Sequence, residues 1–211
     1  MRKDILIFCL LAFMPLALMA QTKLNTTQKD QVVAKINKST AAMQSMQCTF
    51  KQTKSMKMLS KQMVSSGMMY FKRPSKLRWQ YTTPYDYTFI MNGDKVKIKS
   101  AKSTKNVNMQ RDKMFKHITN IILSTMTGDG LKNSADFNTE IFQSASGHFA
   151  RLYPKKKELK QIYKVIELYF NKDLTMVSSV KMEEKTGDVT VVKLNDVKTN
   201  TQINEKMFST H

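Results

Sequence analysis

Residues Gly67–Pro84 read Gly-Met-Met-Tyr-Phe-Lys-Arg-Pro-Ser-Lys-Leu-Arg-Trp-Gln-Tyr-Thr-Thr-Pro, and this stretch decides the fold. Two apolar runs meet at Pro74, and in the second run Leu77, Trp79 and Tyr81 alternate with polar residues. Side chains of a strand alternate between its two faces, and proline suits a turn because its φ is fixed and it has no N–H to donate. The stretch therefore predicts an antiparallel β-hairpin with one half-buried face.

Strand patterns continue on both sides of this hairpin. Cys48–Lys54 precedes it, with Ser55–Lys61 as a turn, and Tyr85–Met91 follows it. Asn92-Gly93 is the strongest short hairpin signal in the chain, and it leads into a return strand at Lys95–Lys99. Roughly ten strands joined by turn residues predict an antiparallel meander. The remaining strands are expected at Phe137–Gln143, His148–Tyr153, Ile162–Phe170, Met176–Met182 and Val189–Val197.

Two segments have helical spacing. The first is expected to run from a cap at Thr26 or Thr27 to about Met46. The second begins near Asp112 and ends near Gly128, where a glycine C-cap is expected. Apolar residues recur three and four apart, so each helix can lay an apolar stripe on the sheet. The stripes are Val33, Ile36, Met43 and Met46 in the first helix, and Met114, Phe115, Ile118, Ile121, Ile122 and Thr125 in the second.

The first twenty residues have the features of an export signal. Arg2 and Lys3 precede the apolar run Ile5–Leu18, and a small-residue cleavage site ends at Ala20. The run is shorter than the ~20 apolar residues that a membrane-spanning helix needs. We therefore expect cleavage after Ala20, which leaves a single exported domain of 191 of the 211 residues, 21–211.

The charge and the cysteines narrow the function class. Lys and Arg number 35 against 16 Asp and Glu, a balance of +19 that often indicates nucleic-acid binding. Export makes nucleic acid an unsuitable partner, and leaves anionic membrane surfaces, acidic proteins, or a merely soluble basic surface. After cleavage only Cys48 remains, so no internal disulfide can form and the thiol is expected in the core.

No pattern of catalytic or metal-binding residues is present. His117 and His148 lie in no recognisable motif. The sequence has no Gly-x-Ser-x-Gly elbow, no His/Cys cluster with metal-ligand spacing, and no phosphate-binding loop. We therefore expect a protein that is not an enzyme and that has no catalytic residues, metal or cofactor.

The Gly67–Pro84 stretch resembles the LolA family, the outer-membrane lipoprotein carriers. Members of that family have an Arg-Pro turn followed by a large apolar residue, a Trp, and a Pro a few positions on. The matching residues here are Arg73, Pro74, Leu77, Trp79 and Pro84, and the resemblance extends to Phe50 and Gln52 before the hairpin and to Asn92-Gly93 after it.

This resemblance implies the fold class α+β, mainly β: an incompletely closed antiparallel half-barrel with an N-terminal helix and a mid-chain helical lid over its concave face. It also implies a monomeric periplasmic carrier that moves lipoproteins from the inner to the outer membrane. The implied partners are acylated lipoproteins, an inner-membrane lipoprotein-releasing ABC transporter and an outer-membrane acceptor. Another lipid cargo, such as a glycolipid or phospholipid, or a protein partner remains an alternative.

The candidate groove lining comes from the strands and from the lid. Methionine can repack around ligands of varying shape, and 14 of the 17 Met residues follow the signal, although an ordinary Met-filled core has the same composition. By the same resemblance, Arg73 holds the lid shut by binding carbonyls at a helix end; a plain surface contact is the alternative. The candidate lining residues are Met69, Leu77, Trp79, Tyr81, Phe89, Met91, Phe115, Ile118, Ile121 and Ile122.

Overall fold

A computed structural model describes residues 21–108, 131 and 135–210. The predicted export signal lies outside the described residues. So does the predicted mid-chain helix, with the lid residues Phe115, Ile118, Ile121 and Ile122. None of the described helices is both long and apolar enough to cross a bilayer.

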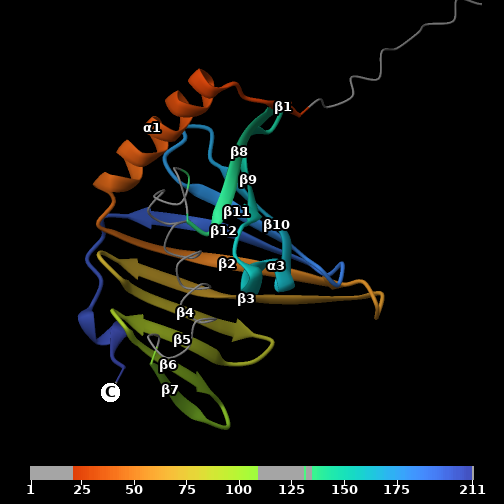
Figure 1. Cartoon of the computed structure of the whole chain (residues 1–211). Helices are drawn as coiled ribbons and strands as arrows, with labels where there is room; N and C mark the ends of the chain where they lie inside the picture. Colours follow the sequence, from red (N-terminus) through yellow and green to blue (C-terminus); the bar gives the residue numbers. More distant parts are fainter. Residues whose placement is uncertain (1–20, 109–130, 132–134, 211) are drawn as a thin grey trace, which may run out of the picture.

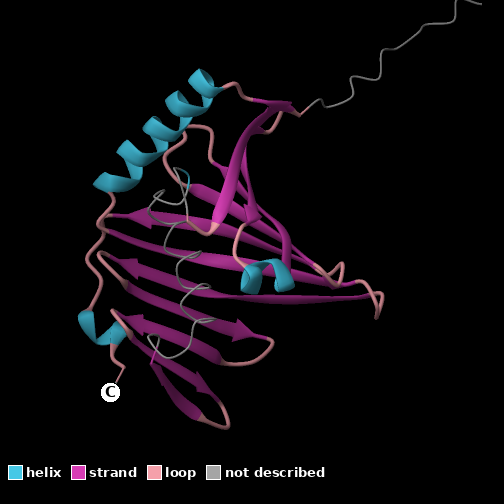
Figure 2. Ribbon diagram, viewed as in Figure 1, coloured by secondary structure: helices cyan, strands magenta, loops and turns pink. Residues whose placement is uncertain are grey.

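The described residues form a single antiparallel sheet of twelve strands with open edges (Figures 1 and 2). The strand order is β1-β8-β9-β10-β11-β12-β2-β3-β4-β5-β6-β7, so β1 and β7 form the two edges. The chain has the predicted open half-barrel. Its strands are β1 Thr22–Lys23, β2 Ser45–Met56, β3 Lys61–Lys72, β4 Lys76–Thr83, β5 Tyr87–Asn92, β6 Lys95–Ser100, β7 Thr104–Asn108, β8 Phe137–Ser144, β9 Gly147–Pro154, β10 Tyr163–Phe170, β11 Val177–Glu184 and β12 Val189–Thr199.

Several short elements were missed by the sequence analysis. The edge strands β1 and β7 contain too few apolar residues to give a period, and the helix α3, Lys157–Ile162, buries only Leu159. The turn η2, Glu205–Phe208, is a single 3-10 helix near the C-terminal end of the described residues. Of these elements, β1 pairs with β8 and η2 packs on β4 and β5, which are neighbours distant in sequence that a local pattern does not reveal.

The first helix, α1, spans Thr26–Ala42 and is shorter than predicted. Its cap is Asn25, not Thr26 or Thr27: the Asn25 side chain accepts a hydrogen bond from the Gln28 N–H (3.0 Å), and the Gln28 side chain accepts one from the Asn25 N–H (3.1 Å). The helix stops because Met43 is extended, and Met46 already belongs to β2.

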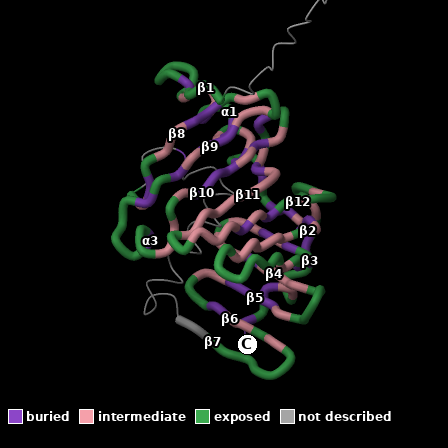
Figure 3. The backbone as a smooth tube through the Cα atoms, turned by 90° about the vertical axis from the view of Figure 1, so that its right-hand side faces the viewer, coloured by how far each residue is buried: buried purple, intermediate pink, exposed green. Residues whose placement is uncertain are grey.

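The helix α1 lies on one face of the sheet, which we call the inner face (Figure 1). Val33 and Ile36 are buried there against residues of β8–β11, including Ile141, Ala150 and Leu168. Buried positions are distributed across most strands of the sheet, whereas the connecting turns are largely exposed (Figure 3). The inner face is therefore the main apolar surface of the protein.

The outer face is partly covered by the C-terminal segment. Phe208 is fully buried, and the Asn92 side chain donates to its carbonyl oxygen (3.4 Å). Glu205 forms ion pairs with Lys72 and Lys76 at the turn between β3 and β4. This cover explains why β5 is buried on both faces, with Ile90 as inaccessible as its neighbours on the inner side.

A buried carboxylate organises the outer face of the other half of the sheet. Glu167 is 4% exposed and accepts hydrogen bonds from Arg151 Nε (2.7 Å), the Tyr169 hydroxyl (2.8 Å) and Lys181 Nζ (3.3 Å). Burial alone raises the pKa of Glu167, but these donors outweigh it and hold the pKa below its ordinary value. Glu167 is therefore a paired charge that joins β9, β10 and β11 through these hydrogen bonds.

The predicted hairpin is formed by β3 and β4. Its register pairs Phe71 with Leu77, Met69 with Trp79 and Gly67 with Tyr81, so Leu77, Trp79 and Tyr81 share a face as predicted. A bulge next to Gly67 brings the two backbones unusually close, because a Cβ at Gly67 would lie 1.8 Å from the Gln80 carbonyl oxygen. Only glycine fits this position.

We expect Gly67→Ala to destabilise the protein by at least about 2 kcal/mol, because the methyl group can be accommodated only by moving the backbone of β4. The free energy of unfolding from a denaturant titration checks this value. The neighbouring Ser66→Ala substitution, at a half-buried position, is the control and should cost less than about 0.5 kcal/mol. Equal stabilities for the two variants would contradict the close approach.

Candidate functional site

Apolar side chains form three parallel rows on the inner face of β2–β6. Each row runs from strand to strand through residues that are direct partners in the sheet, so the rows are set by the strand register. We call this surface the apolar ladder. Row one is Met46, Phe71, Leu77, Met91 and Val96; row two is Cys48, Met69, Trp79, Phe89 and Ile98; row three is Phe50, Gly67, Tyr81 and Tyr87.

The structure brings all six predicted sheet residues together on this ladder. Met69, Leu77, Trp79, Tyr81, Phe89 and Met91 lie in or against one apolar cluster. Their role as ligand lining remains a prediction, as does that of the four lid residues outside the described part of the chain.

Several members of the ladder were not identified from the sequence. Met46 was assigned to the helix, and Phe71 was grouped with an apolar run rather than with a face. Val96 and Ile98 alternate with lysines in the sequence, and that period of two was the signal that could have identified them.

Exposure on the ladder increases from row one to row three. Phe71, Leu77 and Met91 are completely buried; in row three Phe50 is also buried, but Tyr81 and Tyr87 are only half-buried. Row three consists of aromatic rings in contact, with the centroid of Phe50 at 5.1 Å from that of Tyr81. The ladder therefore has a closed end near the β3–β4 turn and a more open end at row three.

Polar groups border the open end. The Tyr81 hydroxyl donates to Gln52 Oε1 (2.9 Å), and Ser65 is the partner of Gln52 in the sheet. Inside the ladder, Trp79 Nε1 is buried and makes no hydrogen bond of normal length to a described residue, although the indole N–H interacts with the Tyr81 hydroxyl. A buried N–H without a full hydrogen bond is costly, so this donor can still take up an acceptor.

Arg73 connects the hairpin to the end of α1. Its Nε donates to the Met43 carbonyl oxygen (2.8 Å), and its Nη2 donates to the Thr40 carbonyl oxygen (3.0 Å). Its backbone N–H donates to the Gln44 carbonyl oxygen (2.9 Å). The last carbonyls of a helix lack partners within the helix, so the guanidinium satisfies them. Arg73 therefore binds carbonyl oxygens at the end of a helix. That helix is the N-terminal helix α1.

The ladder and the arginine turn lie within a region that matches a known family. The family described as "Outer membrane lipoprotein carrier protein LolA" matches residues 41–211. The chain belongs to the LolA family. It thus has the scaffold of the LolA lipoprotein carriers, with the open sheet and the inner apolar face built from the matched region.

Individual relatives of this LolA chain are distant. An outer-membrane lipoprotein carrier protein of Legionella pneumophila (strain Corby) is 24% identical over 144 residues, 68% of each chain. One from Chromohalobacter salexigens is 23% identical over 145 residues, 69% of this chain and 66% of the relative. A solved LolA superfamily protein from Nitrosomonas europaea has a TM-score of 0.46 at 12% identity and covers 86% of this chain and 97% of its own.

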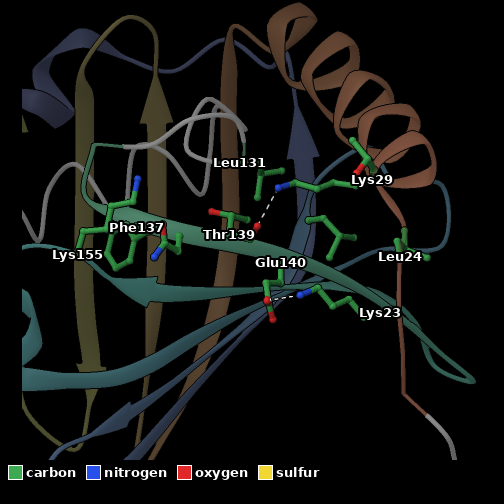
Figure 4. Close-up of a pocket in the computed structure, with 11 residues that line it drawn as sticks. Lys23, Leu24, Lys29, Leu131, Phe137, Thr139, Glu140 and Lys155 are labelled. Carbon is green, nitrogen blue, oxygen red and sulfur yellow. Dashed lines mark hydrogen bonds and ion pairs between the residues drawn. The ribbon is translucent and has the colours of Figure 1, made fainter.

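A cavity of about 480 Å³ lies away from the ladder of this LolA chain, between β8 and the start of α1 (Figure 4). Two lysines of its wall already have partners. Lys29 donates to the Thr139 carbonyl oxygen (2.9 Å), and Lys23 forms an ion pair with Glu140. Among the described residues, no three His, Cys, Asp or Glu side chains are grouped so that they could hold a metal ion.

We expect Arg73→Leu to loosen the last turn of α1, because two carbonyls lose their charged donor. Hydrogen exchange of the Lys38–Met43 amides should become faster, and the free energy of unfolding should fall by about 1–3 kcal/mol. Arg73→Lys, which keeps the charge but has no planar fork, should give an intermediate effect. Exchange unchanged in Arg73→Leu would show that the bonds contribute nothing to the helix end.

Cys48 should be unreactive in the folded protein. Burial, aided by Asp196, raises the pKa of its thiol to about 12, so the thiolate that reacts with disulfide reagents is scarce at pH 8. In protein that starts at Gln21, we expect no labelling under native conditions and one thiol per chain after denaturation. An Ala101→Cys variant, whose new thiol lies in an exposed turn, is the positive control. Rapid native labelling of Cys48 would contradict its burial.

Proposed function

We propose that the protein is a periplasmic carrier that holds the acyl chains of lipoproteins against the apolar ladder and moves them from the inner to the outer membrane. The observation that carries this proposal is the unbroken ladder across β2–β6, in a chain of the LolA family. Its width is about 19 Å, because five strands are separated by four spacings of about 4.8 Å. This width is of the same order as an extended fatty acyl chain.

The polar atoms of the ladder suit the ends of acylated molecules. The acyl chains of lipids and lipoproteins are attached through ester or amide groups, and the carbonyl oxygens of these groups accept hydrogen bonds. Trp79 Nε1, which has no hydrogen bond of normal length to a described residue, is a donor suited to such a carbonyl, and Gln52 and the Tyr81 hydroxyl provide a polar border for the rest of the molecule. An entirely apolar core would need none of these groups.

The buried rows mean that loading requires rearrangement. Row one is inaccessible, so acyl chains must displace side chains to reach it. Met46, Met69 and Met91 are suited to that displacement because methionine is flexible and fills irregular spaces. We propose that the mid-chain segment covers the ladder and that Arg73 acts as the latch, through the end of α1.

Energy must come from outside the chain. Removing an acyl chain of about fifteen methylenes from a bilayer costs on the order of 12 kcal/mol. The sequence has no nucleotide-binding loop of the GxxxxGK[ST] kind, so the cost must be met by a partner. The proposed partners are an inner-membrane lipoprotein-releasing ABC transporter for loading and an outer-membrane acceptor with higher affinity for release.

The carrier function can be tested by adding the purified protein to spheroplasts that retain newly made lipoprotein in the inner membrane. We expect the wild-type protein to release lipoprotein into the soluble fraction. Tyr87→Glu places a charge in row three and should reduce release at least about tenfold, because a bound acyl chain would cover the carboxylate and remove it from water. Thermal unfolding should show that the variant remains folded.

The matched control is Tyr85→Glu, which makes the same change two residues earlier at a side chain that is 55% exposed and outside the ladder. Its release activity should stay within about twofold of wild type. Absence of release by the wild-type protein would contradict lipoprotein transport. Mass spectrometry of co-purified lipids would then identify a glycolipid or phospholipid cargo, if one is bound.

A further inference from the structure

The turn between β2 and β3 exposes two large apolar side chains. Met58 is 92% exposed and Leu59 is 65% exposed, the two highest values among the large hydrophobic residues described. The Ser60 N–H donates to the Lys57 carbonyl oxygen (3.3 Å), so Met58 and Leu59 occupy the two corner positions of a tight turn. Such corners usually carry Gly, Pro, Asn, Asp or Ser, whose backbone freedom or local hydrogen bonds suit a turn. Met58 and Leu59 offer neither advantage, and both side chains are open to contact from outside the protein.

The hairpin carries these residues past β4 and past the last β2–β12 pair, and its nearest described neighbour is the β11–β12 turn, where Asp188 Oδ1 accepts a hydrogen bond from the Lys57 N–H (3.1 Å). On one side, β3 pairs with β4 only as far as Ser66, so no described strand pairs with Lys61–Ser65 there. On the other side, the pairing of β2 with β12 ends at Ser55. Figure 1 shows the end of the β2–β3 hairpin projecting past β4–β6. The segment Lys57–Lys61, which we call the hairpin tip, can therefore reach a flat surface that β4–β6 do not reach, with the β11–β12 turn beside it.

Positive charge surrounds the hairpin tip. Lys57 and Lys61 flank Met58 and Leu59, and neither lysine forms an ion pair with a described carboxylate. The nearby acidic side chains are already paired, since Lys54 Nζ lies 3.0 Å from Glu184 and 3.7 Å from Asp188. The tip thus combines two apolar side chains with two cations in five residues.

We propose that the hairpin tip inserts Met58 and Leu59 into the surface of an anionic bilayer, with Lys57 and Lys61 on the lipid phosphates. This combination of apolar residues and flanking lysines matches the acyl–headgroup boundary of such a membrane. A protein partner fits less well, because two side chains on a narrow turn cannot supply the roughly 1,000 Å² that a stable protein interface buries. The proposal does not depend on what the apolar ladder binds.

The test is co-sedimentation of the purified protein with vesicles of phosphatidylcholine and phosphatidylglycerol (3:1), with no lipoprotein present. We expect binding that weakens when the salt is raised or when phosphatidylglycerol is omitted. Replacing both tip residues, Met58→Ser with Leu59→Ser, should lower the partition coefficient at least about tenfold. The control is Val64→Ser with Met68→Ser, which changes two exposed apolar residues of β3 outside the tip and should alter binding less than about twofold.

A second readout follows insertion directly. The fluorescence of Leu59→Trp should shift to shorter wavelength on vesicle addition and should be quenched by lipids brominated in the acyl chain; unmodified protein, with Trp79 alone, is the blank. No vesicle binding by the wild-type protein, or equal binding by the tip variant, would overturn the proposal. Because these vesicles contain no lipoprotein, either result would leave the carrier function to be judged by the release assay.

Discussion

The structure depends on the need to keep one apolar face of an open sheet away from water. A closed barrel buries its interior with its own strands, whereas this sheet ends at β1 and β7 and must be covered by other elements. Over β8–β11 the cover includes α1, with Val33 and Ile36 buried. Over β2–β6 the same face continues as the apolar ladder, so α1 covers one half of a continuous apolar surface.

Two local features make these halves one unit. Gly67 permits the close approach of β3 and β4 that aligns the three rows, and Arg73 ties the turn of the same hairpin to the end of α1. Both features lie within the stretch Gly67–Pro84. A change in the position of this hairpin is therefore coupled to α1 through hydrogen bonds as well as through packing, which is the connection that a latch requires.

Much of the sheet could be predicted because its strands alternate clearly. Leu77, Trp79 and Tyr81 were placed on one face by period alone, and the register confirmed it. The position of the helix end could not be predicted, because Met43 and Met46 continue the helical period although Met46 is buried in β2. The cover on the outer face was also invisible, since the burial of Ile90 depends on a C-terminal segment more than a hundred residues away in sequence. The exposed tip was read as an ordinary turn because periodicity cannot show how far neighbouring strands extend.

The apolar ladder and the hairpin tip both lie on β2 and β3. Their order along these strands determines which end of the ladder would face a membrane. The ladder begins at the arginine turn and is more open at Tyr81 and Tyr87 in row three, and the hairpin tip follows beyond its polar border. Phe50 and Met58 are eight residues apart, about 26 Å at the rise of an extended strand. If the tip enters a bilayer, the open end of the ladder faces that bilayer and the Arg73 end faces away from it. Acyl chains would then pass along β2 and β3 in either direction without crossing the latched end, so loading and release could use a single opening.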